Sequence, residues 1–224
     1  MCGIIGYVGK RQAGPVLLDG LRRLEYRGYD SAGVAVLDDA RLETRKKKGK
    51  IDEGLARLLQ EHAVKGHLGI GHTRWATHGA PSDENSHPHL DQAGRIAVVH
   101  NGVIENFDQI KQALVAEGHS FKSATDTEVL AHLIGKHYEP LRGEPARNGE
   151  THPLARAVVA ALKEVIGTYG IAVVCTDHPD VIVGARRGSP LIVGVGNNEN
   201  FLASDTSAIV SHTRQVIYLN DLDV

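Results

Sequence analysis

The 224-residue sequence has little that would serve a membrane, a disulfide framework or a nucleic acid. Two cysteines are too few for a disulfide framework, and aromatic residues make up only 4% of the chain. No apolar run approaches the ~20 residues of a membrane-spanning helix, and no basic segment precedes the first apolar stretch, as a signal peptide requires. The formal net charge of −2 gives no reason to expect a nucleic acid or an anionic membrane as partner. We therefore expect a cytoplasmic protein, in a reducing compartment that keeps thiols reduced.

The hydrophobic content of 42% is sufficient for one large domain or two small ones. Apolar patterns predict nine or ten short strands in two groups, among them residues 4–8, 34–37, 68–72, 95–99, 171–175, 181–185, 191–195, 201–203 and 216–219. About five helices are predicted, beginning near residues 15, 51, 107, 126 and 154. Because strands and helices do not alternate, a doubly wound parallel sheet is disfavoured. The sequence therefore predicts an α+β fold, with two antiparallel sheets packed face to face and helices outside.

Two polar segments interrupt these patterns. Residues 41–50 have a basic centre, and we interpret them as a solvated hairpin, because acidic residues elsewhere cancel the field that a nucleic acid would need. Residues 139–152 are rich in Pro, Gly, Arg and Glu and are predicted to form a surface excursion. The sequence stops after Val224 without a terminating signal, as if it were cut from a longer chain.

The most informative stretch is the start, where Cys2 follows Met1 and precedes a short apolar strand. If Met1 is removed, Cys2 carries a thiol and a free α-amine. An α-amine has an ordinary pKa of ~7.7–8.0 and a thiol one of ~8.5, so the amine can take the proton of the thiol. Such a residue is a nucleophile with its own base. The alternative is an ordinary cysteine beside an ordinary start codon.

A nucleophile that attacks an amide needs donors for the oxyanion and a clamp for the substrate. Asn101 and Gly102 follow a predicted strand and offer a side-chain amide and a backbone N–H; the alternative is a tight Asn-Gly turn. Arg74 offers a fork for a carboxylate, and Asp126 can accept from an ammonium, so together they fit the head of an α-amino acid. The alternatives are a surface ion pair for Arg74 and compensation of a helix dipole for Asp126.

Residues 74–79 are a candidate lid that could exclude water from a bound ligand. They contain Trp75, the only tryptophan, for which a buried core position is the alternative. Several histidines raise the question of a metal: His72, His78, His87 and His89. Their spacing matches no common zinc pattern and no cysteine pair supports them, so we expect no metal. Cys175 lies in an apolar strand and is interpreted as an inert core thiol.

Taken together, several blocks resemble one known family in order and spacing: residues 2–4, 26–33, 72–79, 101–106 and 125–128. The family is the glutaminase domain of glutamine–fructose-6-phosphate aminotransferases, a branch of the class II glutamine amidotransferases. The sequences LEYRGYDSAG and HTRWATHG are specific to this branch, because the related phosphoribosylpyrophosphate amidotransferases differ in both stretches. The resemblance covers essentially the whole chain.

The resemblance implies a single type-2 glutamine amidotransferase domain over residues 1–224, with the four-layer αββα fold of N-terminal-nucleophile hydrolases and no cofactor. It implies Cys2 as nucleophile, its α-amine as base, and Asn101 with Gly102 as oxyanion hole. The family's glutamine-binding set matches Arg74, Thr77, His78 and Asp126. Arg27 and His87 match positions that support the site in the family. Trp75 matches the position that gates the passage of ammonia to the second domain. A sugar-isomerase domain that binds fructose 6-phosphate follows in the family and is absent here, and the full-length protein is expected to be a homodimer.

The function implied is hydrolysis of the L-glutamine side-chain amide to glutamate and ammonia through a thioester on Cys2. In the full-length protein, the ammonia would convert fructose 6-phosphate to glucosamine 6-phosphate. Two alternatives remain. Another linear-amide hydrolase of the same fold, such as a bile-salt or penicillin-acylase relative, would need neither charge of the pair Arg74 and Asp126. A catalytically silent regulatory domain would not need Cys2 or the donors Asn101 and Gly102.

Overall fold

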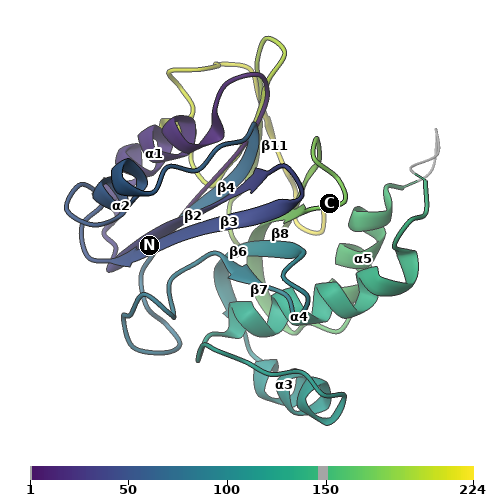
Figure 1. Ribbon diagram of the computed structural model, residues 1–224. Coiled ribbons are helices and arrows are strands. Elements are labelled where there is room, and N and C mark those ends of the chain that lie inside the picture. Colours follow the sequence, from purple (N-terminus) through teal and green to yellow (C-terminus); the bar gives the residue numbers. More distant parts are fainter. Residues whose placement is uncertain (1, 146–150) are drawn as a thin grey trace.

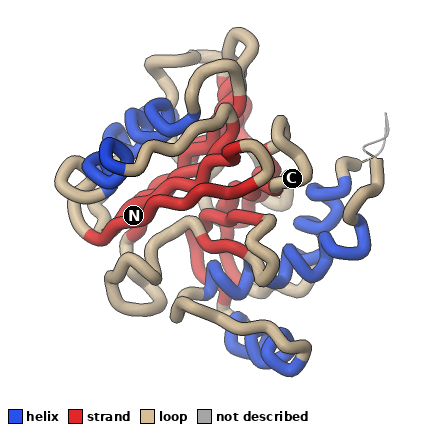
Figure 2. Tube along the Cα trace, in the orientation of Figure 1, coloured by secondary structure: helices blue, strands red, loops and turns tan. Residues whose placement is uncertain are grey.

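The computed structural model describes residues 2–145 and 151–224, so Met1 and part of the predicted excursion at 139–152 lie outside the described residues. Two antiparallel sheets stack face to face, and helices cover both outer faces (Figure 1). The tube view shows the same layers, with strands at the centre and helices at the periphery (Figure 2). The predicted α+β fold with αββα layers is therefore confirmed.

The larger sheet has the strand order β11-β9-β10-β1-β4-β2-β3 within the described part of the chain. Its strands are β1 (Gly3–Val8), β2 (Ser31–Asp38), β3 (Arg41–Lys48), β4 (Leu68–Arg74), β9 (Ile192–Val195), β10 (Asn200–Ala203) and β11 (Val216–Tyr218). Strand β1 pairs with β10 on one side and with β4 on the other. Cys2, which directly precedes β1, is therefore attached to the interior of the sheet and not to an edge.

The smaller sheet has the order β5-β6-β7-β8 among the same residues. Its strands are β5 (His89–Leu90), β6 (Ile96–Ile104), β7 (Gly167–Cys175) and β8 (Ile182–Arg187). The expected end of a strand at Val99 is wrong, because β6 continues through Asn101 and Gly102, which pair with Gly170 and Tyr169 of β7. Pairing with a neighbouring strand outweighs the local turn preference of an Asn-Gly sequence.

On the outside of the larger sheet lie α1 (Ala13–Arg23) and α2 (Leu55–Glu61). The smaller sheet is covered by α4 (Asp126–Tyr138) and α5 (Pro153–Leu162), and α3 (Phe107–Ala116) packs against α4. Three 3₁₀ turns occur in the described chain: η1 (Glu25–Arg27), η2 (Glu139–Leu141) and η3 (Thr206–Ala208). Helix α1 begins before Pro15, where the prediction placed its start. A proline is tolerated there because first-turn N–H groups have no partner within the helix.

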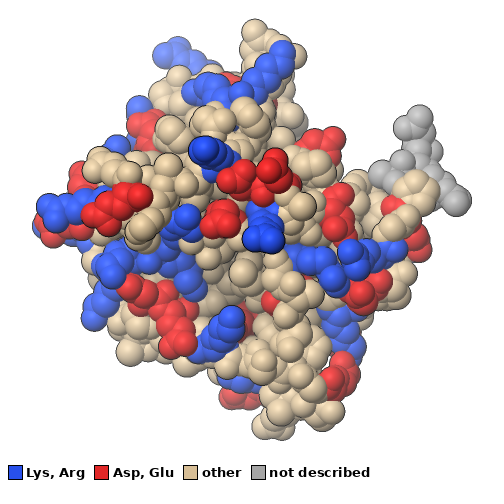
Figure 3. Space-filling view, viewed as in Figure 1, with Lys and Arg blue, Asp and Glu red and all other residues tan. Residues whose placement is uncertain are grey.

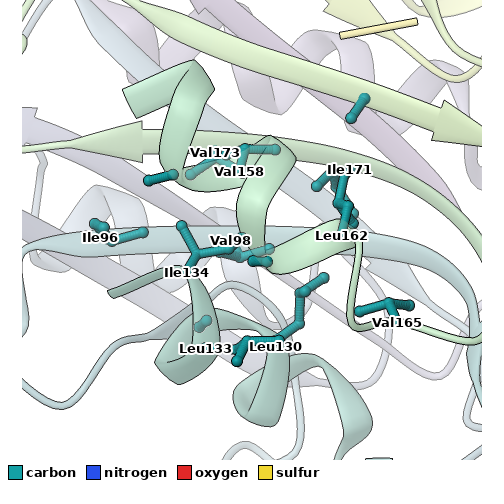
Figure 4. Packing of buried hydrophobic residues seen from close by; sticks show 14 of the residues in the cluster. Ile96, Val98, Leu130, Leu133, Ile134, Val158, Leu162, Val165, Ile171 and Val173 are labelled. Atoms are coloured by element: carbon teal, nitrogen blue, oxygen red, sulfur yellow. The ribbon is translucent and has the colours of Figure 1, made fainter. Parts of the chain in front are cut away.

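Alternation along the strands divides the core into layers. In β1, Ile4 packs between the two sheets with Ile70, whereas the next residue, Ile5, faces α1. In β6 of the smaller sheet, Ile96 and Val98 point away from the larger sheet and pack under α4 and α5 (Figure 4). Since successive side chains point to opposite faces of a sheet, a strand covered on both faces carries a continuous apolar run. The buried strand predicted at residues 4–8 follows from this arrangement.

The basic segment at residues 41–50 forms β3, which pairs with β2 as a hairpin at the edge of the larger sheet. Charged side chains on an edge strand discourage pairing with other chains. Lys47 pairs with Asp83 at 2.8 Å, and Figure 3 shows basic and acidic side chains interspersed over this face. The interpretation as a solvated hairpin is confirmed. Among residues 2–145 and 151–224, no helix has the length and apolarity needed to cross a bilayer.

Candidate active site

A narrow cavity brings together the start of β1, the end of β4 with the loop after it, β6 and the start of α4. Its free volume is about 10 Å³. Its lining consists of Cys2, Arg74, Trp75, Thr77, His78, His87, His100, Gly102, Thr125, Asp126 and Thr127. The predicted site residues missing from this lining are Asn101, which contacts Cys2 from the side, and Arg27. Residues from four distant segments of the sequence therefore meet at the predicted nucleophile.

Cys2 is half-buried, and its Sγ accepts a hydrogen bond of 3.2 Å from the backbone N–H of Trp75. Burial raises the pKa of the Cys2 thiol above its ordinary value, and the Trp75 N–H and the nearby Arg74 charge offset part of that rise. A protonated thiol at neutral pH needs a base before it can attack. The other cysteine, Cys175, is fully buried in β7, and burial raises its pKa too, as expected for a core thiol.

Asn101 and Gly102 lie beside Cys2 near the end of β6. The Asn101 Nδ2 donates to the Cys2 carbonyl oxygen at 3.3 Å. Gly102 has φ = 136°, and a Cβ there would come within 2.1 Å of the Thr168 carbonyl oxygen. Only glycine takes this backbone conformation at that spot without strain. An amide NH₂ and the backbone of a glycine therefore border the nucleophile, an arrangement that suits the stabilisation of an oxyanion.

Arg74 and Asp126 bring opposite charges to the same cavity, and both are buried, with 3% and 4% of their surface exposed. A surface ion pair for Arg74 is therefore excluded. Its Nη2 donates to the carbonyl oxygens of His78 and Gly79, whereas its buried Nη1 has no hydrogen-bond partner among the described residues. Asp126 Oδ2 accepts from the backbone N–H of Ile104 at 2.9 Å. A free guanidinium donor and a buried carboxylate can receive a ligand that carries both charges.

Residues 75–79 cover the cavity. Trp75 is 55% exposed, so a core position for this tryptophan is wrong. The loop is held at its start by Asp30, whose Oδ2 accepts from the Ala76 N–H at 2.5 Å, and near its end by the ring of His78, which packs edge-on against Phe107. Asp30 was not predicted as a site residue, although it lies inside the recognised stretch 26–33. The residues of this loop are exposed or half-buried, which is consistent with a lid.

Burial keeps two histidines beside the cavity, His72 and His87, neutral. Burial lowers the pKa of His72 to about 3 and that of His87 well below its ordinary value. Their rings stack at 4.2 Å. His78, predicted to bind glutamine, lines the cavity and is only partly buried. No group of three or more His, Cys, Asp or Glu side chains in the described ranges could hold a metal ion.

Sequence reasoning missed His100 and Thr127, which also line the cavity. His100 Nε2 lies 3.2 Å from the Thr168 carbonyl oxygen and its Nδ1 lies 3.2 Å from Thr127 Oγ1. Because the carbonyl can only accept, Nε2 carries the proton of a neutral ring and Nδ1 accepts from Thr127. His100 Nδ1 is also 3.8 Å from Asp126 Oδ2. The alternation of β6 would have placed His100 near the site, had the strand been predicted to continue beyond residue 99.

Arg27, predicted as a supporting residue, lies outside the cavity. Its Nη1 donates to Ser204 Oγ at 3.3 Å, and the same oxygen accepts from the backbone N–H of Ile4 at 2.9 Å. Asp205 lies 4.0 Å from the guanidinium. Arg27 therefore reaches the strand that carries Cys2 through one intermediate side chain.

Known proteins are similar to this chain in sequence and in structure. A protein family described as a glutamine amidotransferase domain matches residues 59–141, which contain Arg74, Asn101 and Asp126. The chain is similar to the glutamine amidotransferases, and its fold is that of their N-terminal-nucleophile branch. Within this class it is similar, over its whole length, to the glutaminase part of glutamine–fructose-6-phosphate aminotransferases (isomerizing).

The identity to the aminotransferase of Thermus thermophilus is 54%, and that to the enzyme of Caldanaerobacter subterraneus is 51%. The chain spans 35% of the length of each of these two relatives. Among solved structures, the glutamine phosphoribosylpyrophosphate amidotransferase from B. subtilis, complexed with ADP and GMP, superposes with a TM-score of 0.74 at 30% identity. That match covers 97% of this chain and 44% of the other.

Proposed function

We propose that the chain hydrolyses the side-chain amide of L-glutamine to glutamate and ammonia, with Cys2 as nucleophile. The observation that carries the proposal is that Cys2, Arg74 and Asp126 line the same cavity. The free donor of Arg74 suits an α-carboxylate, and Asp126 suits an α-ammonium. An amino-acid head held by these two groups leaves its side-chain amide to extend toward the thiol. Thr77 and His78 complete the glutamine contacts in this proposal.

The proposed reaction begins after Met1 has been removed. The α-amine of Cys2 takes the thiol proton, and Sγ attacks the amide carbon of glutamine. The carbonyl oxygen becomes an oxyanion, which receives hydrogen bonds from Asn101 Nδ2 and the N–H of Gly102. The ammonium of Cys2 returns the proton to the leaving nitrogen, so ammonia departs and a thioester remains. Water then attacks the thioester, and glutamate leaves with the thiol restored. His87 and Arg27 support this machinery from outside the reacting atoms.

In a longer protein that contains a sugar-isomerase domain, the ammonia would convert fructose 6-phosphate to glucosamine 6-phosphate. The printed name of the relatives supports this assignment, as does the full-length match to their glutaminase part. Trp75 is exposed at the mouth of the cavity, where it can gate the passage of ammonia to such a domain. We infer a cytoplasmic protein, and a homodimer for the longer chain.

The test is an ammonia assay with material shown by intact mass to begin at Cys2. We expect release from L-glutamine and none from benzylpenicillin or a glycine-conjugated bile salt. In Arg74→Lys, the loss of one charge-assisted hydrogen bond, about 1.5–3 kcal/mol, should raise KM by about 10–100-fold with little change in kcat. Arg22→Lys, at an exposed ion pair, is the matched control and should leave KM unchanged. Hydrolysis of an acyl amide in preference to glutamine would favour the alternative amide-hydrolase function.

A further inference from the structure

We infer that His72 is a positioning residue that holds the side-chain amide of Asn101 with its NH₂ group turned toward Cys2. The inference rests on the proposed glutamine hydrolysis for its catalytic meaning, but the orientation itself stands on the contacts of these side chains. His72 is on β4 of the larger sheet, and Asn101 is on β6 of the smaller sheet. The two residues therefore form a polar contact across the interface between the sheets, which also contains a cluster of buried apolar residues.

The contact is short and fully buried. His72 has no exposed surface, and its Nε2 lies 2.9 Å from Asn101 Oδ1. In the register of the larger sheet, His72 is opposite Ile4 of β1, two residues from the nucleophile. The other end of the Asn101 amide, Nδ2, donates to the Cys2 carbonyl oxygen at 3.3 Å. One amide group thus connects the imidazole to the residue that would perform the attack.

The protonation of the ring determines which way the amide faces. Burial lowers the pKa of His72 to about 3, so the ring is neutral and carries a single N–H. Since a carbonyl oxygen only accepts, that proton must be on Nε2 to satisfy Asn101 Oδ1. The other ring nitrogen, Nδ1, then carries the lone pair, and it is buried without a hydrogen-bond partner among the described residues. Stacking on His87, at 4.2 Å with the planes 26° apart, keeps the ring in this orientation.

The opposite tautomer would reverse the amide. With its proton on Nδ1, the ring would accept at Nε2, and Asn101 would have to present its NH₂ to His72. Its oxygen would then face the Cys2 carbonyl and the place where negative charge develops. A preorganised donor at that position lowers the barrier, whereas an oxygen there opposes the charge. His72 therefore acts on the transition state through Asn101, and its loss should appear in kcat and not in the binding of glutamine.

The test compares two polar replacements of different reach. In His72→Gln, the amide reaches the position of Nε2 and can donate to Asn101, whereas in His72→Asn it reaches only that of Nδ1. We expect His72→Asn to lower kcat by at least about tenfold and to leave KM unchanged. The largest loss expected is the ~10²–10³-fold decrease in kcat that follows the loss of one oxyanion donor. His72→Gln should recover most of the rate. The control is the same pair of substitutions, to Asn and to Gln, at His132, which should leave kcat unchanged. His132 is a buried histidine that stacks on Phe121 and lies outside this cavity.

A ligand series separates positioning from folding. L-glutamate γ-semialdehyde forms a hemithioacetal with Cys2, whose oxygen occupies the oxyanion position, whereas the product L-glutamate has no such oxygen. In folded His72→Asn, the affinity for the semialdehyde should fall by the same factor as kcat, and that for glutamate should not change. The inference is overturned if His72→Asn retains the wild-type affinity for the semialdehyde, or if His72→Gln loses as much of it as His72→Asn does.

A measurement on the unaltered chain needs no variant to fold. The ¹⁵N shifts of the His72 ring, observed by NMR, should show protonated Nε2 and unprotonated Nδ1. A proton on Nδ1 contradicts the inference. Failure of the wild-type chain to release ammonia from glutamine would refute the proposed function instead, and the ring shifts would still decide the orientation of Asn101.

Discussion

Among single residues, Asn101 allows the most direct test of the proposed chemistry, because its Nδ2 already contacts Cys2. We expect Asn101→Ala to slow turnover by about 10²–10³, the usual loss for one oxyanion donor, with KM for glutamine and thermal stability nearly unchanged. Steady-state ammonia release and a melting curve measure these quantities. Asn220→Ala, at an exposed position, is the control. Unchanged turnover in Asn101→Ala would remove this residue from the oxyanion hole.

The α-amine of Cys2 is the proposed base, and its role can be tested by blocking it. With Met1 attached, the Cys2 nitrogen belongs to a peptide bond and has no basic lone pair, while burial keeps the thiol protonated near neutral pH. A form with an uncleavable residue before Cys2 should therefore fold normally and release no ammonia, and active material should begin at Cys2. Intact mass spectrometry of the active fraction, paired with the assay of the extended form, is the measurement. Full activity in chains that retain Met1 would require another base.

At the scale of residues, the sequence predicts candidate site residues from local stretches. Cys2, Arg74 and Asp126 were predicted from their own neighbourhoods, and the structure places them in one cavity. Asp30 and His100 were missed because their contacts, with Ala76 and with Thr168, arise only after folding. No pattern within one segment indicates which distant residue its side chains will contact.

At the scale of elements, the start of α4 determines where Asp126 lies. Thr125 caps the helix by accepting from the Glu128 N–H at 3.2 Å. The carboxylate of Glu128, which is 5% exposed, in turn accepts from the backbone N–H groups of Lys122 and Ser123 at 2.9 and 2.6 Å and from the Ser123 hydroxyl at 2.7 Å. The capping-box spacing was evident in the sequence, but the loop that the carboxylate secures was not.

Replacing Glu128 by Gln should disturb this loop, since an amide NH₂ would face donors that now share one carboxylate. We expect the free energy of unfolding to fall by about 1–3 kcal/mol, the cost of an unsatisfied buried polar group, and KM for glutamine to rise as Asp126 shifts. Urea unfolding and steady-state kinetics are the measurements. Glu117→Gln, at an exposed pair with Lys136, should stay within about 0.5 kcal/mol of wild type. Equal effects of both substitutions would contradict a specific role for Glu128.

The elements themselves show which physical signals a sequence carries. Buried strands such as β1 were predicted because both of their faces are covered, which leaves an unbroken apolar run. Strand β5 was missed because two residues, His89 and Leu90, are too few to show a period. The end of β6 was misplaced because its pairing with β7 outweighs the Asn-Gly turn signal, and that pairing is not local in the sequence.

At the scale of the whole molecule, the chain spans about a third of the aminotransferases that it resembles. The cavity holds groups for an amino acid, and the proposal places the sugar phosphate on a domain outside these 224 residues. We therefore expect ammonia release into solvent, no glucosamine 6-phosphate, and no response of the rate to fructose 6-phosphate. A coupled ammonia assay with and without the sugar phosphate measures this. Stimulation of the chain by fructose 6-phosphate would contradict the assignment.

The contact of Arg74 with the loop carbonyls of His78 and Gly79 has a further consequence. These oxygens occupy only Nη2, so a carboxylate that uses both guanidinium nitrogens, and not Nη1 alone, needs the loop to release Arg74. For such a bidentate complex, the apparent glutamine affinity equals the intrinsic affinity multiplied by the fraction of chains whose loop has released Nη2. A partner surface that docks on the exposed ring of Trp75 and draws the loop away would strengthen glutamine binding without contacting the amino acid. A lower KM in a full-length protein than in this chain would measure that coupling, and equal values would show that the loop opens freely.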